Sequence, residues 1–342
     1  MSAMICYVAG KSGGHIIPAL THAQQVKSQQ PDLKVLFFST DSPLDRSLLE
    51  HNKLIDIYQP LTLANVPRKN LLAWPTFLLQ LIKVVWISFR LLHRHKPSKV
   101  VSMGGYISVP VCLVAKMLGI PIELYELNVV PGAAVNLLSR WATVTHCCFA
   151  QTKAYLSPSA RCGFTPYPLR YTERDRCGRD EACAGLGIDT KKTVICILGG
   201  SQGSRFINDL VKQWVSHNLK ARSDVAIIHQ TGAQDIEQMQ QFYQQQDLQA
   251  LVFAYRHDIH LCYAAADVIL ARAGAGTLFE ILFFKRPAII IPLESKTTDH
   301  QRDNAFAMQA DHPDLFKVLV QADVEKAPEI CFAMLGRFCQ NR

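Results

Sequence analysis

Residues 7–20 read YVAGKSGGHIIPAL: the end of an apolar strand that starts near Met4, a glycine-rich turn, and a helix that begins near His15. The GKS inside this stretch looks like the end of an ATP-binding P-loop, which needs a glycine five residues before the glycine that precedes the lysine. Counting back from Gly10 reaches Ile5, so the spacing excludes a P-loop. A strand, a glycine turn and a helix still form an anion site, because the helix N-terminus offers unpaired amides and the positive end of its dipole.

The size and charge of the chain set the next limits. It has 342 residues, 49% hydrophobic and 19% charged, with a formal net charge of +8. That length exceeds one ordinary core and predicts two domains, which we place at residues 1–165 and 166–342. The charge indicates an anionic partner, but nucleic acid, an anionic membrane face and a phosphorylated substrate satisfy it equally. We expect no signal peptide before the first strand.

The eleven cysteines show no spacing typical of a metal site. Cys147 and Cys148 are adjacent, Cys177 and Cys183 are six apart, and no CxxC or histidine-spaced pair occurs. An odd number of cysteines, mostly within apolar segments, is typical of small buried side chains in a reducing cytoplasm. We therefore expect no metal cluster. We expect no cofactor either.

Apolar runs alternate with helical segments in two successive series, which predicts an α/β protein with two doubly wound, Rossmann-like domains facing a cleft. The stretch 151–180 separates the two series; it has three prolines and no clear period, so we interpret it as a linker. In such sheets ligands lie at the carboxyl ends of the strands. The expected strands are 4–9, 34–38, 99–102 and 121–126 in the first series, and 192–200, 225–229, 250–254, 267–271 and 287–292 in the second.

Three loops follow expected strands and open helices: 10–14, 199–204 and 272–280. Their glycines either let a diphosphate approach the backbone or only make tight turns. None reads GxGxxG, and only Asp41 stands near the place of a ribose-binding acid, so a dehydrogenase is disfavoured. Glu280, early in the helix after the third loop, either complements the helix dipole or accepts hydrogen bonds from two ribose hydroxyls. Arg170, near the linker, is either a phosphate clamp or a surface arginine.

The segment 71–92, LLAWPTFLLQLIKVVWISFRLL, is long enough to span a bilayer, but Lys83 near its middle argues against a span. We predict an apolar helix whose broad face either packs on the sheet or docks on an anionic membrane, helped by nearby cations. The expected face comprises Trp74, Phe77, Leu78, Leu81, Val85 and Phe89, and the cations are Arg68, Lys69, Lys83, Arg90 and Arg94.

Six ordered blocks, taken together, resemble the MurG family of bacterial glycosyltransferases, which convert lipid I to lipid II in peptidoglycan synthesis for cell-wall growth, cell shape and division. The resemblance runs from about residue 5 to about residue 310. The blocks are SGGHIIPA, VVSMGGYISVPVCLVAKMLGIPI, YELNVVPGAAVNLLSRWA, GGSQGSRFIN, YAAADVILARAGAGTLFE and DHQRDNA.

This resemblance implies a GT-B fold and metal-independent, inverting transfer of GlcNAc from UDP-GlcNAc to the 4-hydroxyl of the muramyl sugar of lipid I. It implies partners too: UDP-GlcNAc, the polyprenyl-diphosphate-linked muramyl peptide and an anionic membrane surface, not nucleic acid. The protein would be peripheral, at the cytoplasmic face of the inner membrane. The implied acceptor residues are Lys11, Gly13, Gly14 and Tyr106, and the implied donor residues are Ser12, Gly13, Gly14, Asn128, Arg170, Ser201, Gln202, Gly203, Arg256, Ala275, Gly276, Thr277, Glu280 and Gln301.

Some positions depart from the family pattern. Lys11 stands where the family generally has glycine, which adds a cation beside an anion site. Tyr125 and Leu127 alter the usual HEQN, and Tyr167 replaces the asparagine of NPxR. The tail after Ala310 is short, so we expect the return helix onto the first domain to be reduced.

The inferred reaction needs a base, and two residues compete for that role. His15 stands at a helix N-terminus, where the dipole would lower its pKa and keep the ring neutral, although it could equally be a structural residue. Glu126 ends a strand pointing into the same cleft; it could act as the base, orient His15 or bind an acceptor hydroxyl. Two rival functions stay open: a UDP-GlcNAc 2-epimerase of the same fold, and a donor-binding homologue that has lost transfer.

Overall fold

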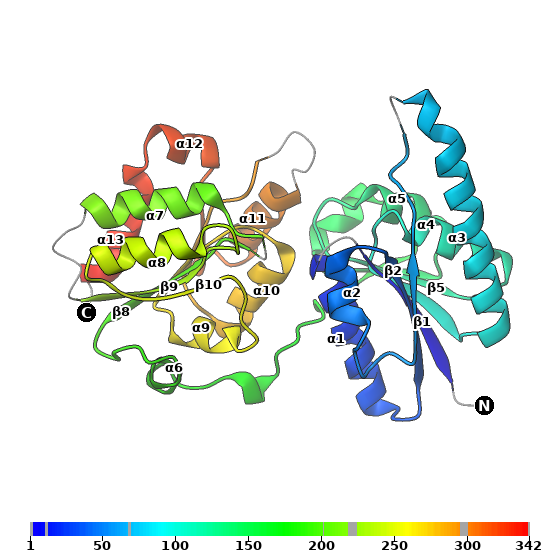
Figure 1. Cartoon of the computed structure of the whole chain (residues 1–342), viewed down its shortest axis with the longest axis horizontal. Helices are drawn as coiled ribbons and strands as arrows, with labels where there is room; N and C mark the ends of the chain where they lie inside the picture. Colours follow the sequence, from blue (N-terminus) through cyan, green and yellow to red (C-terminus); the bar gives the residue numbers. More distant parts are fainter. Residues whose placement is uncertain are drawn as a thin grey trace. The chain divides into compact units, whose positions relative to one another are not determined.

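The structure is a computed structural model that describes residues 3–10, 13–67, 70–200, 202–217, 224–294 and 300–340. The chain divides into two units, Met1–Arg170 and Tyr171–Arg342, and each contains a parallel sheet with helices on both faces (Figure 1). The predicted α/β class with two Rossmann-like, doubly wound domains is confirmed. The division between the units lies later in the chain than residue 165.

Unit 1 is built on seven parallel strands. In sheet order they are β3 (Ile57–Leu61), β2 (Lys34–Thr40), β1 (Met4–Val8), β4 (Lys99–Ser102), β5 (Ile122–Glu126), β6 (Val144–Cys147) and β7 (Cys162–Phe164). Its helical segments are α1 (Gly13–Gln29), α2 (Pro43–Leu49), η1 (Leu71–Ala73), α3 (Trp74–His95), α4 (Ser108–Met117), α5 (Ala133–Leu138) and η2 (Ala150–Tyr155).

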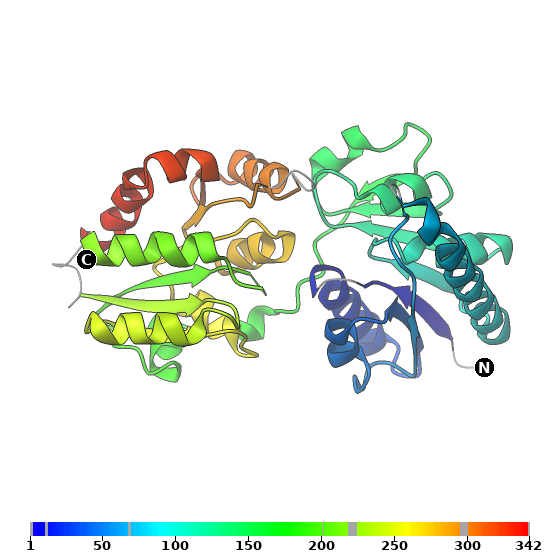
Figure 2. The ribbon, with the colours of Figure 1, turned by 45° about the horizontal axis from the view of Figure 1, so that its top comes forward.

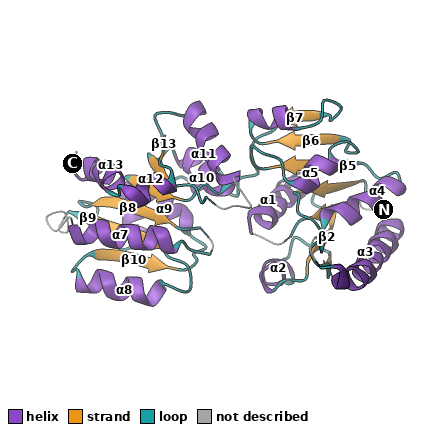
Figure 3. Ribbon diagram, turned by 90° about the horizontal axis from the view of Figure 1, so that it is seen from above, coloured by secondary structure: helices purple, strands orange, loops and turns teal. Residues whose placement is uncertain are grey.

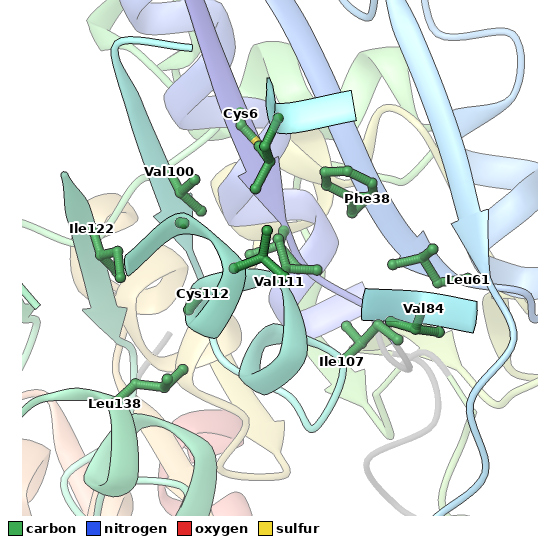
Figure 4. Packing of buried hydrophobic residues seen from close by; sticks show 14 of the residues in the cluster. Cys6, Phe38, Leu61, Val84, Val100, Ile107, Val111, Cys112, Ile122 and Leu138 are labelled. Atoms are coloured by element: carbon green, nitrogen blue, oxygen red, sulfur yellow. The ribbon is translucent and has the colours of Figure 1, made fainter. Parts of the chain in front are cut away.

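The two faces of this sheet are covered by different helices, so its central strands are apolar without alternation. Cys6 of β1 packs with Val84 of α3 and Val111 of α4 in the main core of the unit (Figure 4). Tyr7, the next residue, points to the opposite face, where its hydroxyl is 2.9 Å from Nδ1 of His22 on α1. Helix α1 therefore covers the face opposite to α3 and α4.

Unit 2 repeats this architecture with six parallel strands (Figures 2 and 3). In sheet order they are β10 (Gln249–Phe253), β9 (Val225–Gln230), β8 (Thr193–Leu198), β11 (Val268–Ala271), β12 (Ala288–Ile290) and β13 (Phe316–Val318). Its helical segments are η3 (Glu173–Asp175), α6 (Arg179–Gly185), α7 (Arg205–His217), α8 (Ile236–Gln245), α9 (Ile259–Ala265), α10 (Ala275–Phe284), α11 (His300–Asp311), α12 (Gln321–Lys326) and α13 (Glu329–Gln340).

The interpretation of residues 151–180 as a linker is partly wrong. This stretch holds β7, which pairs with β6 in register Thr145 to Cys162 and forms the edge of the first sheet. A three-residue edge strand is too short to show a period in the sequence. Strands β3, β6 and β13 were missed as well. At the other end of the chain, α13 packs into the core of unit 2 through Cys331 and Leu335.

Strand order reverses beside β1 in unit 1 and beside β8 in unit 2, because β4 and β11 return to pair with these first strands. The loops that leave such neighbouring strands diverge to opposite faces and open a crevice at their carboxyl ends. In unit 1 these loops follow Val8 and Ser102, and in unit 2 they follow Leu198 and Ala271. All of these loops carry glycines.

Candidate active site

The glycine turn after β1 is required by close packing. A Cβ atom at Gly10 would lie 2.8 Å from Oδ2 of Asp45 and 2.8 Å from the backbone nitrogen of Thr40. Asp45 itself is fully buried and accepts a hydrogen bond from the Thr40 nitrogen at 3.1 Å. The steric explanation for this glycine therefore holds. Lys11 and Ser12 lie outside the described residues.

Helix α1 begins at Gly13, earlier than the predicted start near His15, so Gly13, Gly14 and His15 form its first turn. The His15 ring faces the loop that follows β4: a Cβ on Gly104 would lie 4.0 Å from Nε2, and one on Gly105 would lie 4.0 Å from Nδ1. Both glycines have positive φ, +87° and +83°, which side-chain-bearing residues rarely adopt. The backbone can thus turn beside the imidazole.

Tyr106 follows these two glycines, in the same loop. Its hydroxyl donates a hydrogen bond of 2.8 Å to the carbonyl of Leu63, and burial raises its pKa. The structure therefore brings the predicted acceptor residue Tyr106 into the loop that the His15 ring faces.

Glu126, at the end of β5, is 3% exposed and organises the loop that follows it. Its Oε1 accepts hydrogen bonds from the backbone nitrogen of Asn128 at 2.9 Å and from Nδ2 of the same residue at 3.1 Å. Its Oε2 accepts from the nitrogen of Gly132, the N-cap of α5, at 2.9 Å. The hydroxyl of Thr152 donates to the Asn128 carbonyl at 2.9 Å. Three N–H donors thus stabilise and orient this carboxylate.

Tyr125, one of the departures from the family pattern, belongs to a buried polar network on the α1 face of the sheet. His22 is 2.9 Å from the hydroxyl of Tyr7 through Nδ1 and 2.9 Å from the hydroxyl of Tyr125 through Nε2. Burial lowers the pKa of His22 to about 4 and raises the pKa of Tyr125 to about 12. The Tyr125 ring also lies 4.5 Å from the ring of His146, centroid to centroid. Tyr125 therefore has a structural explanation in this chain.

The glycine turn after β8 is packed backbone against backbone. A Cβ on Gly203, whose φ is +76°, would lie 2.1 Å from the carbonyl oxygen of Thr231, and one on Gly199 would lie 2.8 Å from the nitrogen of Ser204. Gln202 precedes Gly203 in this turn and is exposed. Ser201 lies outside the described residues.

Arg272, which the sequence analysis did not single out, joins the loops of unit 2. It is 7% exposed, and its Nε donates to the hydroxyl of Ser204 at 3.0 Å. Its Nη1 donates to the carbonyls of Ile291 and Pro292 at 3.1 and 3.2 Å and to Oε1 of Gln321 at 2.8 Å. Burial lowers the pKa of this guanidinium to about 10. An arginine directly after the apolar strand VILA was the signal that could have revealed it.

Ala275, Gly276 and Thr277 form the first turn of α10, after the N-cap Gly274. Glu280 lies one turn further on, and the first turn carries no acidic residue. Its position weakens the explanation by the helix dipole, which acts within the first turn.

Two further donor candidates have defined contacts in unit 2. Oε1 of Gln301, on α11, accepts from the nitrogen of Ala273 at 3.2 Å and from that of Leu293 at 2.9 Å, which joins the loops after β11 and β12. The side chain of Arg256 is paired with Asp258. Arg170 is the last residue of unit 1 and is half-buried.

Helix α3 has a buried side and a strongly apolar exposed side. It is the one helix, among the described residues, that is long and apolar enough to cross a membrane by length and composition. However, Phe77, Val84 and Leu92 are buried in the core of unit 1.

The face predicted for α3 is therefore partly wrong, because Phe77 is 8% exposed and Leu81 and Val85 pack against the core. Arg68 and Lys69 lie outside the described residues. The large exposed apolar side chains of the helix are Trp74, Leu78, Leu79, Ile82, Trp86 and Phe89.

No three His, Cys, Asp or Glu side chains among the described residues are grouped so that they could hold a metal ion. What the described sites have in common is glycine turns at helix N-termini, at the reversal points of two parallel sheets. This arrangement defines the class as a two-domain α/β protein whose glycine turns can bind the diphosphate of a nucleotide-type ligand.

Comparisons with known proteins agree with that class. Residues 5–147 match the glycosyltransferase family 28 N-terminal domain, and residues 194–316 match its C-terminal domain. The chain is 32% identical over 310 residues to the UDP-N-acetylglucosamine--N-acetylmuramyl-(pentapeptide) pyrophosphoryl-undecaprenol N-acetylglucosamine transferase of Protochlamydia amoebophila, covering 89% of this chain and 80% of the relative. It resembles the crystal structure of Acinetobacter baumannii MurG with a TM-score of 0.73 and 27% identity, over 99% of this chain and 91% of that one. The chain belongs to the MurG family of glycosyltransferases.

The rival epimerase function has weaker support. A crystal structure of a candidate UDP-N-acetylglucosamine 2-epimerase from Listeria monocytogenes superposes with a TM-score of 0.58 at 10% identity, over 92% of this chain and 88% of that one. Identity at this level shows a common fold alone.

Proposed function

We propose that this chain transfers N-acetylglucosamine from UDP-GlcNAc to the 4-hydroxyl of the muramyl sugar of a polyprenyl-diphosphate-linked muramyl peptide, with inversion at the anomeric carbon. The observation that carries the proposal is the pair of glycine turns at the points where strand order reverses in the two sheets. They occur in a chain that is 32% identical to the N-acetylglucosamine transferase of Protochlamydia amoebophila. Unit 2 binds the donor, and unit 1 binds the acceptor.

The donor site uses the N-termini of α7 and α10. Their first amides, with Gln202, Gly203 and Thr277 around them, bind the diphosphate and receive the charge that develops when UDP leaves. We assign Ser201 and Arg170 to the binding of the same diphosphate. Arg272 supports the donor site, because its buried guanidinium donates a hydrogen bond to Ser204 at the start of α7.

The remaining donor contacts follow the family resemblance. The carboxylate of Glu280 accepts hydrogen bonds from the ribose, and the backbone at Arg256 meets the uracil. Gln301 binds the sugar, and its Oε1 already joins the loops after β11 and β12.

The acceptor diphosphate binds the first turn of α1, helped by Lys11. His15 then acts as the general base that removes the proton of the attacking 4-hydroxyl. Glu126 is the second candidate for this step. The carboxylate of Glu126 accepts hydrogen bonds from three N–H groups. These bonds favour a different role for Glu126, which is to hold the loop of residues 128–132.

We propose further that the protein docks on the anionic cytoplasmic face of the inner membrane through the exposed side of α3. Leu79, Ile82 and Trp86 are 69%, 64% and 58% exposed, and the guanidinium carbon of Arg90 lies 5.5 Å from the centroid of the Trp86 ring. Apolar side chains rimmed by cations suit an anionic interface. Docking would bring unit 1 to a lipid-linked acceptor.

Radiolabelled UDP-GlcNAc, incubated with and without a polyprenyl-diphosphate muramyl acceptor, tests the reaction. We expect label in the lipid fraction only when the acceptor is present. Epimerised donor without transfer would instead identify an epimerase. Binding of UDP-GlcNAc with neither product would identify a donor-binding homologue without transferase activity.

A further inference from the structure

A buried tyrosine contacts the ribose-binding candidate from the interior of unit 2. The hydroxyl of Tyr263, on α9, donates a hydrogen bond of 2.7 Å to Oε2 of Glu280, on α10. Tyr263 is 1% exposed, whereas Glu280 is only partly buried. A carboxylate has about four acceptor positions, so it accepts this bond and can still accept others.

The tyrosine ring is fixed by aromatic neighbours. It stacks on Phe284 with a centroid distance of 5.4 Å and an interplanar angle of 6°, and Tyr171 meets it nearly edge-on at 6.5 Å and 66°. Tyr171 also packs on Phe284 at 5.4 Å. A buried ring in contact with two aromatic neighbours has few orientations open to it, so its hydroxyl is held in place.

Glu280 needs such support to bind two hydroxyls at once. A glutamate side chain has several rotatable bonds, and fixing it on binding a ligand costs conformational entropy. Its position in the second turn of α10 also denies it the favourable interaction with the helix dipole that acts in the first turn. The charge-assisted hydrogen bond from Tyr263 fixes its orientation before a ligand arrives.

We infer that Tyr263 is a positioning residue for the donor, which holds the carboxylate of Glu280 so that it accepts hydrogen bonds from the two vicinal hydroxyls of a uridine nucleotide ribose. The inference rests on the proposed donor site. Tyr263 thereby determines the preference for ribonucleotides over their deoxy analogues without touching the ligand.

The test compares three variants and two ligands. Tyr263→Phe removes only the hydroxyl, and Glu280→Ala removes the carboxylate. Tyr243→Phe is the matched control, because Tyr243 is also 1% exposed and its hydroxyl is 2.8 Å from Nδ1 of His229 rather than Glu280. Calorimetry measures the affinity of each variant for UDP and for 2′,3′-dideoxy-UDP, which lacks both ribose hydroxyls.

We expect Tyr263→Phe to weaken UDP binding roughly fivefold and Glu280→Ala at least tenfold, as is usual when a hydrogen bond to a charged group is lost. Both variants should bind 2′,3′-dideoxy-UDP as the unmodified protein does, and Tyr243→Phe should bind both ligands normally. Equal loss of both ligands in Tyr263→Phe would show a merely structural hydroxyl and overturn the inference. The inference would also be overturned if Tyr263→Phe bound UDP with unchanged affinity while Glu280→Ala bound it more weakly. If Glu280→Ala also binds UDP normally, the proposed ribose contact itself fails.

Discussion

Nε of Arg272 donates a hydrogen bond of 3.0 Å to the hydroxyl of Ser204, and this single bond ties the end of β11 to the start of α7. The same hydroxyl accepts from the nitrogen of Ile207 at 3.4 Å, inside the first turn of α7. The guanidinium therefore fixes the helix N-terminus that we propose as the diphosphate site.

Replacing this arginine by lysine tests that coupling. A lysine ammonium is a point donor that cannot reach the Ser204 hydroxyl and the carbonyls of Ile291 and Pro292 in the fixed geometry of a guanidinium. We expect Arg272→Lys to weaken UDP binding roughly tenfold, measured by calorimetry. Arg179→Lys is the control, because Arg179 is a half-buried arginine of the same unit paired with Asp267. Equal UDP affinity in Arg272→Lys and the unmodified protein would contradict the coupling.

Glu126→Gln separates the structural role of Glu126 from a catalytic one. A glutamine places an NH₂ group where one oxygen now accepts an N–H, so either Asn128 or Gly132 loses its acceptor. We expect the free energy of unfolding of unit 1 to fall by about 1–3 kcal/mol, together with a slower transfer rate. Urea unfolding and single-turnover rates on the same sample measure both. A variant of normal stability that has lost turnover would instead support Glu126 as the base.

The sequence predicted the two doubly wound units because their central strands are buried on both faces and read as unbroken apolar runs, as in β1 and β8. The short edge strands β7 and β13 were not predicted, because three residues are too few to show a hydrophobic period. Their place in the sheet depends on pairing with distant strands, which no local pattern contains.

The sequence predicted those parts of the candidate site where the backbone geometry requires glycine, as at Gly203. It did not predict side chains whose role depends on contacts with residues distant in the sequence. Tyr263 and Arg272 look like core residues of the segment 263–280, and only the fold brings them to Glu280 and Ser204. The face of α3 was misjudged for a related reason, because apolar residues on all sides of a helix do not reveal which side packs.

Acidification should destabilise unit 1 through His22. Burial lowers its pKa from 6.5 to about 4, so the unfolded state binds more protons between these values and stability falls as the pH falls from about 6.5 towards 4. Lys99 and His146 lower this pKa further and Glu123 opposes them. His146, whose Nε2 lies 3.8 Å from Oε2 of Glu123, and Lys99, which donates to the same oxygen at 2.8 Å, lower the pKa of Glu123 from 4.5 to about 2, so loss of its contribution begins only below pH 4.5.

The full effect of His22 is on the order of 3 kcal/mol. Hydrogen exchange of β1 amides between pH 6.5 and 4.5 measures it in unit 1, and we expect the slope to flatten in His22→Gln. An unchanged slope in this variant would assign the acid sensitivity to other groups.

Membrane docking should depend on the exposed side of α3. Ile82→Ser combined with Trp86→Ser removes two side chains that are 64% and 58% exposed, so the fold should persist while binding to anionic vesicles falls at least tenfold. Tyr255→Ser, at a 53% exposed site in unit 2, is the control. Arg94→Glu should reduce binding further at low salt, as should Lys69→Glu, whose position lies outside the described residues. The measurement is the amount of protein that pellets with anionic vesicles. If neither these changes nor added salt alters that amount, α3 is not the docking surface.

The catalytic prediction concerns His15, whose ring faces the Gly104–Gly105 turn. The donor is proposed to bind unit 2, so His15→Ala should leave UDP-GlcNAc affinity within about twofold. Turnover should fall roughly 100-fold or more, which is the usual scale for losing a general base. His217→Ala, at an exposed histidine of α7, is the matched control. Donor affinity and single-turnover rate are measured on the same preparation of each variant. If His15→Ala retains turnover, or if its donor binding collapses together with the rate, His15 is not the base and Glu126 becomes the remaining candidate.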